Sequence, residues 1–353
     1  MSGDRRLSAP GQLAAGDDLA PAGTATAELP DEPLAEFAAK HGLRASAERP
    51  PAGRYIRSLW QRRHFIVAFA TAKNIALYTE ARLGQLWQVL TPLLNAGVYF
   101  LIFGLLLHIN RGIPNYLGFL VTGVFVFNFT QRAYLSSSTV ITESLPLIRA
   151  LRFPRAALPL AYVMIELEQM LLSMVVLAVI VLFTGEPLTW YWLLAIPALL
   201  LQTIFNIGSG LAVARLGSTV NDFSQLLPFL MRTWLYVSGV LFNISTLDIA
   251  HKYIAILQLN PAAIYITLVR EAILQTQRQS QPGAQPYNAR LCLQWHTVGH
   301  SAHATQQQQM LSAYCHPVTN PAHYWYYGIA WAVLALVVGF YFFWRAEAKY
   351  GRG

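Results

Sequence analysis

Three arginines, Arg149, Arg152 and Arg155, recur at every third position in a short stretch between two strongly apolar segments. We expect a helix at Leu145–Arg152, because this spacing gathers the arginines on one side. The helix can then rest its other side on the end of a membrane bundle. The apolar residues on that other side are Leu147, Ile148 and Leu151. Phe153-Pro154 ends the helix, since proline disfavours helical geometry at the preceding residue. The alternative is a plain loop that is basic because it lies in the cytoplasm.

Glu166, Glu168 and Arg232 are charged residues inside apolar segments. A charged side chain at membrane depth is energetically costly, and it usually faces the interior of a helix bundle or a water-filled space. These residues suit either a proton relay or an ion pair that stabilises the bundle. The sequence leaves both interpretations open.

The lysines do not form a phosphate-binding loop, because none of Lys40, Lys73, Lys252 and Lys349 follows the glycine of the G-x-x-x-x-G-K-[ST] pattern. We therefore expect this chain to hydrolyse no ATP and to bind no cofactor itself. A membrane glycosyltransferase is the enzymatic alternative. It would need paired acidic residues near the membrane, and the pair Asp17-Asp18 lies in the N-terminal tail.

The composition is that of a membrane protein. Of the 353 residues, 55% are hydrophobic and 12% are charged, and the mean hydropathy is +0.38. A soluble domain has about 25% charged residues. The net charge of +8 fits arginine-rich cytoplasmic loops near anionic lipid headgroups, so we expect no nucleic-acid partner.

Apolar segments predict an all-α polytopic membrane protein with six transmembrane helices, since about 20 apolar residues cross a bilayer. Loops rich in arginine place both termini in the cytoplasm. The transmembrane domain covers residues 83–353, and its expected spans lie near residues 89–109, 116–135, 157–183, 190–214, 223–242 and 324–344.

Two further regions precede the spans. Residues 1–50 are rich in Ala, Gly, Pro and Asp, and we expect a disordered cytoplasmic tail without a signal peptide. Residues 51–82 contain an expected amphipathic helix that lies in the cytoplasmic interface. An ordinary basic segment beside the membrane is the alternative. The apolar side of the expected helix carries Ile56, Leu59, Trp60, Val67 and Ala70.

The loop at 244–323 is expected outside the cytoplasm. Its first part, Tyr253–Val269, is broken at Asn260-Pro261, and each half is too short to cross, so it is interpreted as a re-entrant pair of short helices. The rest forms a small extracytoplasmic lobe. Cys292 and Cys315 are expected to form a disulfide there, which the chain-entropy model values at roughly 3–4 kcal/mol. The histidines are interpreted as solvated rather than metal-binding: His296, His300, His303, His316 and His323.

The arginine-rich stretch resembles a known family. Leu147-Ile148-Arg149, Phe153-Pro154-Arg155 and Leu158-Pro159-Leu160 are similar to the cytoplasmic loop of ABC-2 type permeases that export polysaccharides. Arg82-Leu83-Gly84 with Trp87 and Pro92 is similar to that family's entry into the first span. The resemblance implies a coupling helix that docks into a separate ATPase. Its residues here are Leu147, Ile148, Arg149, Leu151, Arg152, Phe153, Pro154 and Arg155.

The resemblance covers about residues 54–270 and the last span, and it implies the partners. Two copies of the chain form a channel in the bacterial inner membrane. Two ATPase subunits bind the ATP and the magnesium. The transported substrate is an undecaprenyl-linked glycan of the O-antigen, teichoic-acid or cell-wall galactan type. The resemblance also implies that the short helices before the last span are gate helices.

Aromatic residues in the expected spans could stack on sugar rings along the transport path, or they could face lipid and neighbouring helices. The candidates for such a path are Tyr99, Phe100, Phe103, Phe125, Phe127, Phe129, Tyr134, Trp234 and Tyr236. An ABC-2 permease for drugs or lipids would share the topology without needing these aromatics. A membrane enzyme of glycan assembly is a further alternative.

Overall fold

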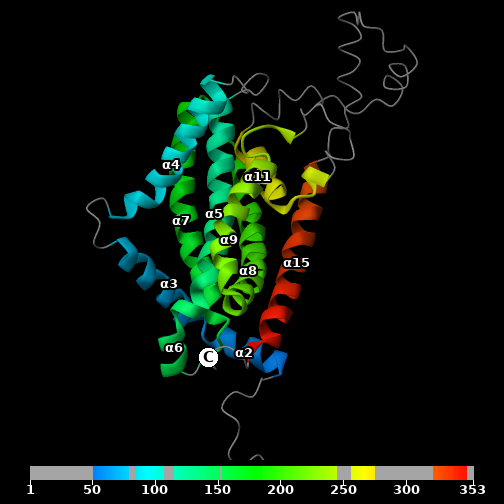
Figure 1. Cartoon of the computed structure of the whole chain (residues 1–353). Helices are drawn as coiled ribbons and strands as arrows, with labels where there is room; N and C mark the ends of the chain where they lie inside the picture. The colour runs from blue at the N-terminus through cyan, green and yellow to red at the C-terminus, as the bar shows by residue number, and fades with distance from the viewer. Residues whose placement is uncertain are drawn as a thin grey trace, which may run out of the picture. The chain divides into compact units, whose positions relative to one another are not determined.

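The computed structural model describes residues 51–78, 84–106, 115–151, 153–244, 256–274 and 321–347, all within the compact unit Arg49–Gly353. Every regular element in these ranges is a helix, as expected (Figure 1). Three predictions lie outside the described residues: the disordered tail, the extracytoplasmic lobe with its disulfide between Cys292 and Cys315, and the role of Arg152.

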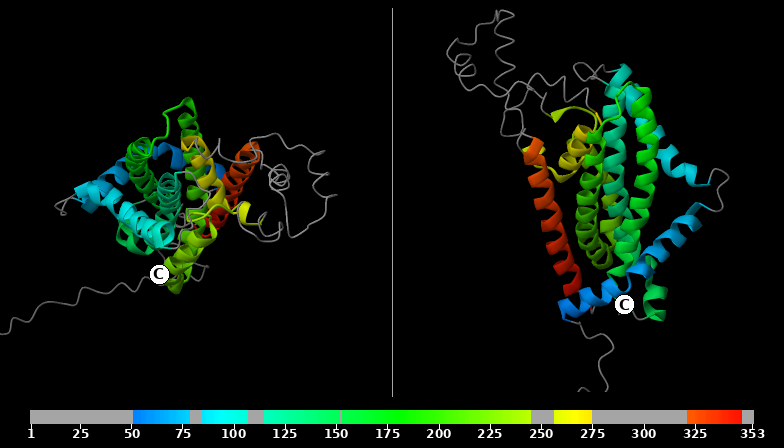
Figure 2. Two further views of the ribbon diagram at one scale, coloured as in Figure 1. Left: turned by 90° about the horizontal axis from the view of Figure 1, so that it is seen from above. Right: turned by 180° about the vertical axis from the view of Figure 1, so that it is seen from behind.

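Helix α5, Tyr116–Glu143, runs through the middle of the bundle and is buried along most of its length (Figures 1 and 2). It packs against α7, Ala157–Phe183, and α8, Ala195–Thr219. Asn115 begins α5 in a left-handed conformation with φ of 51°, and its side-chain oxygen accepts a hydrogen bond from the Gly118 amide at 3.1 Å. Asparagine suits both requirements, because it tolerates this conformation and caps helices well.

Four helical segments among the described residues are long and apolar enough to cross a membrane: Val89–Leu106, Ala157–Phe183, Trp190–Thr219 and His323–Arg345. They confirm four of the expected spans as candidates, within a few residues at each end. The first combines α4, Trp87–Tyr99, with a π-helical segment, Phe100–Leu106. The last lies in α15, Pro321–Arg345. Figure 1 shows α15 at the side of the bundle opposite to α4.

The other two expected spans correspond to α5 and α9, Asn221–Val237. With 28 residues α5 is about 42 Å long, enough to span a bilayer, but its polar residues lower its hydropathy. Several of those polar residues, among them Thr122, Thr130 and Ser137, are buried in protein, because α5 is the central helix. With 17 residues, α9 is at the lower limit for crossing. The six-span count therefore stays a prediction.

Helices α8 and α15 touch through their backbones. A Cβ atom on Gly339 would overlap backbone atoms of Gly208, and a Cβ on Gly208 would overlap backbone atoms of Ala335 and Leu336. Small residues allow such close approach between membrane helices. Gly208 and Gly339 therefore form the crossing point of the two helices.

Helix α11, Pro261–Ile273, is buried between α5, α8 and α15. The Asn260 side chain caps it by accepting a hydrogen bond from the Ala262 amide at 3.1 Å, and it also accepts one from Trp234 Nε1 at 2.8 Å. This helix occupies the second half of the expected re-entrant pair. Residues 253–255 of the first half lie outside the described ranges.

The expected interface helix is broken in two at Arg62: α2 is Ala52–Gln61 and α3 is Arg63–Tyr78. The side that packs on the bundle carries Tyr55, Ile66 and Ala70, all buried. Of the residues expected on one apolar side, Ala70 is on this packed side. Leu59 is partly buried against the bundle as well, whereas Ile56, Trp60 and Val67 are exposed.

Candidate functional site

The arginine-rich segment forms a short helix at one end of the bundle, at the bottom of Figure 1. This helix, α6, is Leu145–Ala150, with Pro146 in its first turn. Ile148 is buried and Leu147 is partly buried against the apolar cluster at this end of the bundle. Arg149 is exposed. The apolar and basic residues of α6 therefore face in different directions, as the sequence predicted.

The helix is shorter than the expected Leu145–Arg152. Leu151 has an extended backbone with φ of −123° and ψ of 138°, so α6 ends at Ala150, four residues before Pro154. Leu151 is half exposed instead of lying on the packed side. Phe153 returns to the bundle, where its ring centroid lies 5.9 Å from that of Phe65 in α3. The site thus consists of a short helix that ends at an extended Leu151, and of a turn at Arg155 and Ala156 that leads into α7.

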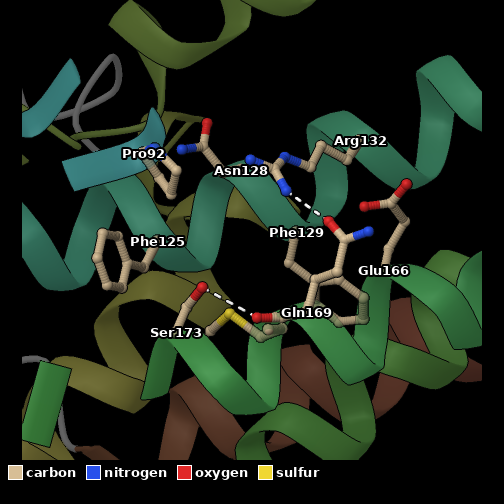
Figure 3. A pocket seen from close by; sticks show the side chains of 9 residues that line it. Pro92, Phe125, Asn128, Phe129, Arg132, Glu166, Gln169 and Ser173 are labelled. Carbon is tan, nitrogen blue, oxygen red and sulfur yellow. Dashed lines mark hydrogen bonds between the residues drawn. The ribbon is translucent and has the colours of Figure 1, made fainter. Parts of the chain in front are cut away.

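A second polar site lies between α4, α5 and α7, where a pocket of about 240 Å³, including its open mouth, is lined by both polar and apolar side chains (Figure 3). Arg132 Nη1 donates a hydrogen bond to Gln169 Oε1 at 2.6 Å. Ser136 Oγ donates to Glu166 Oε1 at 2.7 Å. The other carboxylate oxygen of Glu166 is buried and has no hydrogen-bond partner among the described residues. The pocket is lined by Pro92, Phe125, Asn128, Phe129, Arg132, Glu166, Gln169, Met170 and Ser173.

Glu168 faces a different neighbour from Glu166. Thr71 Oγ1 and Asn74 Nδ2 of α3 donate hydrogen bonds to the two carboxylate oxygens of Glu168, at 2.8 and 2.9 Å. Gln169 Nε2 donates to Asn74 Oδ1 at 3.3 Å and so joins this group to the pocket. Arg232, the third charge predicted from the sequence, is exposed on α9.

Sequence reasoning missed Arg132, Asn74 and Thr71. Arg132 is the charged residue of the second expected span. A charge inside an apolar segment is the same signal that marked Glu166 and Glu168 in the third span. Asn74 and Thr71 gave no such signal, because uncharged polar residues are common in an interface helix. Their partner Glu168 is more than 90 positions away in the chain.

The candidate channel aromatics fall into two groups. Four residues of α5 are buried in the core of the bundle: Phe125, Phe127, Phe129 and Tyr134. Trp234 packs against two of them, at ring-centroid distances of 6.0 Å from Phe127 and 5.7 Å from Tyr134. The remaining candidates keep accessible surface, Tyr236 most of all with 43% exposure. They are Tyr99, Phe100, Phe103 and Tyr236.

Comparison with known proteins agrees with this architecture. Residues 66–274, more than half of the chain, match the family described as "ABC-2 type transporter". The chain is 27% identical over 236 residues to the O-antigen export system permease protein RfbA of Myxococcus xanthus, covering 67% of this chain and 89% of that protein. It is 28% identical over 211 residues to a protein of the same name from Klebsiella pneumoniae, covering 59% and 80%.

The matched range includes most of α3, α4 to α9 and α11, and thus both α6 and the polar pocket. The family match therefore covers α6 and three of the four candidate spans among the described residues. This chain belongs to the ABC-2 type transporter family.

Proposed function

We propose that this chain is the transmembrane permease subunit of an ATP-driven exporter that moves a lipid-linked polysaccharide from the cytoplasm across the bacterial inner membrane. The observation that carries the proposal is the similarity to permeases named for O-antigen export, which extends over 80–89% of their length. The substrate is of the O-antigen, teichoic-acid or galactan type, carried on undecaprenyl.

The end of the bundle that carries α6 faces the cytoplasm, together with both termini. The distribution of arginines supports this orientation, because cytoplasmic ends of membrane proteins are rich in Lys and Arg. Three groups of arginines belong to this end: those of α2 and α3, those beside α6, and Arg345 at the end of α15. In this topology α5 and α9 complete six spans, and α11 belongs to a re-entrant pair near the outer surface. Cys292 and Cys315 form a disulfide in the outer loop.

A separate ATPase, present in two copies, docks on α6 and binds the ATP and magnesium. The exposed basic side of α6 supplies the contact, while Ile148 anchors the helix in the bundle. Closure of the two ATPases upon ATP binding then moves α6, and α6 moves the spans.

Two copies of the chain enclose the path, and α9 faces it. Arg232 is exposed on α9, and an arginine at membrane depth is far more stable against water than against lipid. Tyr236 is exposed one turn further along, as sugar stacking requires. The buried aromatics of α5 instead hold α9 in place.

The proposal is tested by deleting the gene and restoring it with variants. Loss of the protein should leave the lipid-linked glycan inside the cell and remove the corresponding glycan from the surface. Surface labelling and extraction of the lipid-linked pool measure both. A normal surface glycan in the deletion strain, with changed drug or lipid export, would instead support a different ABC-2 substrate.

Docking is tested by charge reversal. Arg149→Glu is expected to weaken ATPase binding and reduce export by about tenfold or more, because one charge-assisted contact is worth roughly 1.5–3 kcal/mol. Arg57→Glu on the exposed side of α2 is the matched control, and it should leave both unchanged. Normal export by an Arg149→Glu/Arg152→Glu variant that no longer binds the ATPase would overturn the mechanism.

A further inference from the structure

Three segments that are distant in the sequence meet in a buried polar cluster at the α6 end of the bundle. The hydroxyl group of Tyr55 in α2 donates a hydrogen bond to Glu347 Oε2 at 2.9 Å. Glu347 lies two residues beyond the end of α15, and its Oε1 accepts a hydrogen bond from the Arg155 amide at 3.1 Å. The Tyr55 oxygen also accepts a hydrogen bond from the Ala156 amide at 3.0 Å. Arg155 Nη1 completes the cluster by donating to the Glu347 carbonyl oxygen.

This cluster caps the start of α7. A helix leaves its first backbone N–H groups without an intrahelical partner, and a Ser, Thr, Asp or Asn at the N-cap position usually accepts from one of them. Alanine, the N-cap residue of α7 at position 156, has no side chain that can do so. The first two helical amides, of Ala157 and Leu158, donate to the carbonyl oxygens of Pro154 and Arg155. The Tyr55 hydroxyl group and the Glu347 carboxylate accept instead from the two amides just before them, those of Ala156 and Arg155, and so fix the turn that starts α7. The carboxylate also lies at the positive end of the α7 dipole, where a negative charge is stabilised.

Burial makes each of these bonds consequential. Tyr55 is 2% exposed, Ala156 is fully buried and Glu347 is 8% exposed. Burial raises the pKa of Glu347, while the hydrogen bonds from Arg155 and Tyr55 and the positive charge of Arg155 act in the opposite direction. Removing one member therefore leaves buried polar partners unsatisfied, which destabilises more than the loss of an exposed bond does.

The cluster also lies on the path by which a movement of α6 reaches the membrane. The six-residue helix α6 continues through residues 151–156 directly into α7, a candidate span of 27 residues. The last two residues of this connection, Arg155 and Ala156, are the ones held by Glu347 and Tyr55. A displacement of the connection therefore acts on α2 and α15 as well as on α7.

We propose that Tyr55 and Glu347 are positioning residues that fasten the α6–α7 connection to α2 and α15, so that a movement of α6 displaces all three helices together. This role rests on the proposed function, since it supplies the transmission that an ATP-driven exporter requires. Neither residue contacts the ATPase or the glycan. Without them α6 moves with less effect on the last span, and ATP hydrolysis proceeds with less transport.

The first measurement concerns the permease alone and does not depend on its substrate. Tyr55→Phe removes only the hydroxyl group and Glu347→Gln removes only the charge, so both variants retain the side-chain volume. Hydrogen exchange in the purified protein should become about tenfold faster at the amides of Arg155 and Ala156, as the loss of one buried hydrogen bond implies. Tyr341→Phe, at an exposed position of α15, and Glu143→Gln, at an exposed position of α5, are the matched controls. Unchanged exchange in both variants would overturn the capping role.

The second measurement compares glycan export with ATP hydrolysis in the reconstituted exporter. The amount exported per ATP should fall roughly fivefold in each variant, since a lost buried hydrogen bond changes a conformational equilibrium by that factor or more. ATPase binding to α6 should remain normal, as in the two control variants. Faster amide exchange with an unchanged export-to-ATP ratio would show a purely structural cap and overturn the positioning role. If the wild-type protein exports no glycan, the proposed function fails, while hydrogen exchange still decides on the cap.

Discussion

The candidate spans that contain α15 and α4 are equally exposed, since only 22% of the residues in the most apolar part of each are buried. Their contacts with the bundle nevertheless differ. Helix α15 touches α8 through the glycine backbones at Gly339 and Gly208. Helix α4 contains Pro92, continues into the π-helical segment Phe100–Leu106, and leaves Gly97 with open space around it. Proline and π-helical turns both interrupt regular helix geometry. The comparison indicates a rigid side of the bundle at α8 and α15 and an adaptable side at α4.

The largest expected effect breaks the rigid side. Gly339→Val puts a branched side chain into the backbone of α8, so we expect destabilisation by more than about 3 kcal/mol and little folded protein. Size-exclusion profiles and thermal unfolding in detergent measure this. Gly97→Val is the control on α4, where nothing lies within 4 Å of an added Cβ, and it should change stability by less than about 1 kcal/mol. Equal effects of the two variants would remove the distinction between the two sides.

The second prediction concerns α11, which packs against α5, α8 and α15 on the rigid side. Arg270 donates from Nε to the Phe119 carbonyl oxygen at 3.1 Å, and from Nη1 and Nη2 to the carbonyl oxygens of Gly239 and Val240, both at 2.8 Å. Arg270→Met leaves these three buried acceptors without this donor, so we expect a loss of about 2–4 kcal/mol.

Thermal unfolding of the purified protein checks this prediction. Arg232→Met, at the exposed arginine of α9, is the matched control and should be far milder in its effect on stability. An Arg270→Met protein as stable as the control variant would show that the carbonyl contacts do not hold α11.

The smallest expected effect sharpens the comparison at the lower end of α15. Burial raises the pKa of Glu347 above its ordinary value of 4.5. The Glu347 carboxyl group therefore binds its proton more tightly in the native state than in the unfolded state. Its contribution to stability is fully present below that ordinary value and is lost as pH rises through the higher native pKa. Relative to Glu347→Gln, the wild-type protein should therefore lose unfolding free energy as pH rises above 4.5. Parallel unfolding curves of both proteins across this range would exclude the linkage.

Local patterns in the sequence predicted much of the helical framework. The span at 157–183 coincides with α7, because a long uniform apolar segment is the strongest sequence signal of a membrane helix. Of the three arginines expected on one side of a helix, only Arg149 lies in α6, whereas Arg155 lies beyond it next to Glu347. The existence of α6 follows from the spacing, although its last turn does not. Leu151 leaves the helix there, and the backbone geometry that ends a helix is poorly specified by residue type.

Contacts between distant residues were beyond such patterns. Tyr55 and Glu347 are 292 positions apart, and neither residue is unusual in its own segment. The assignment of α5 as a span depends on such contacts too. Arg132 and the polar residues of α5 lower its hydropathy, and only the folded bundle shows that they face protein. The candidate site was therefore predictable as a basic helix, but its connections to the spans were not.

The capping of α7 by Glu347 also sets an order of assembly. A ribosome adds about 5–20 residues per second, so residue 347 emerges roughly 15–60 s after Tyr55, which lies 292 positions before it. In the later part of that interval, once α2 and α7 have been synthesised, the Arg155 amide still lacks its eventual acceptor. The α6 end of the bundle can thus adopt its final geometry only after nearly the whole chain has been synthesised.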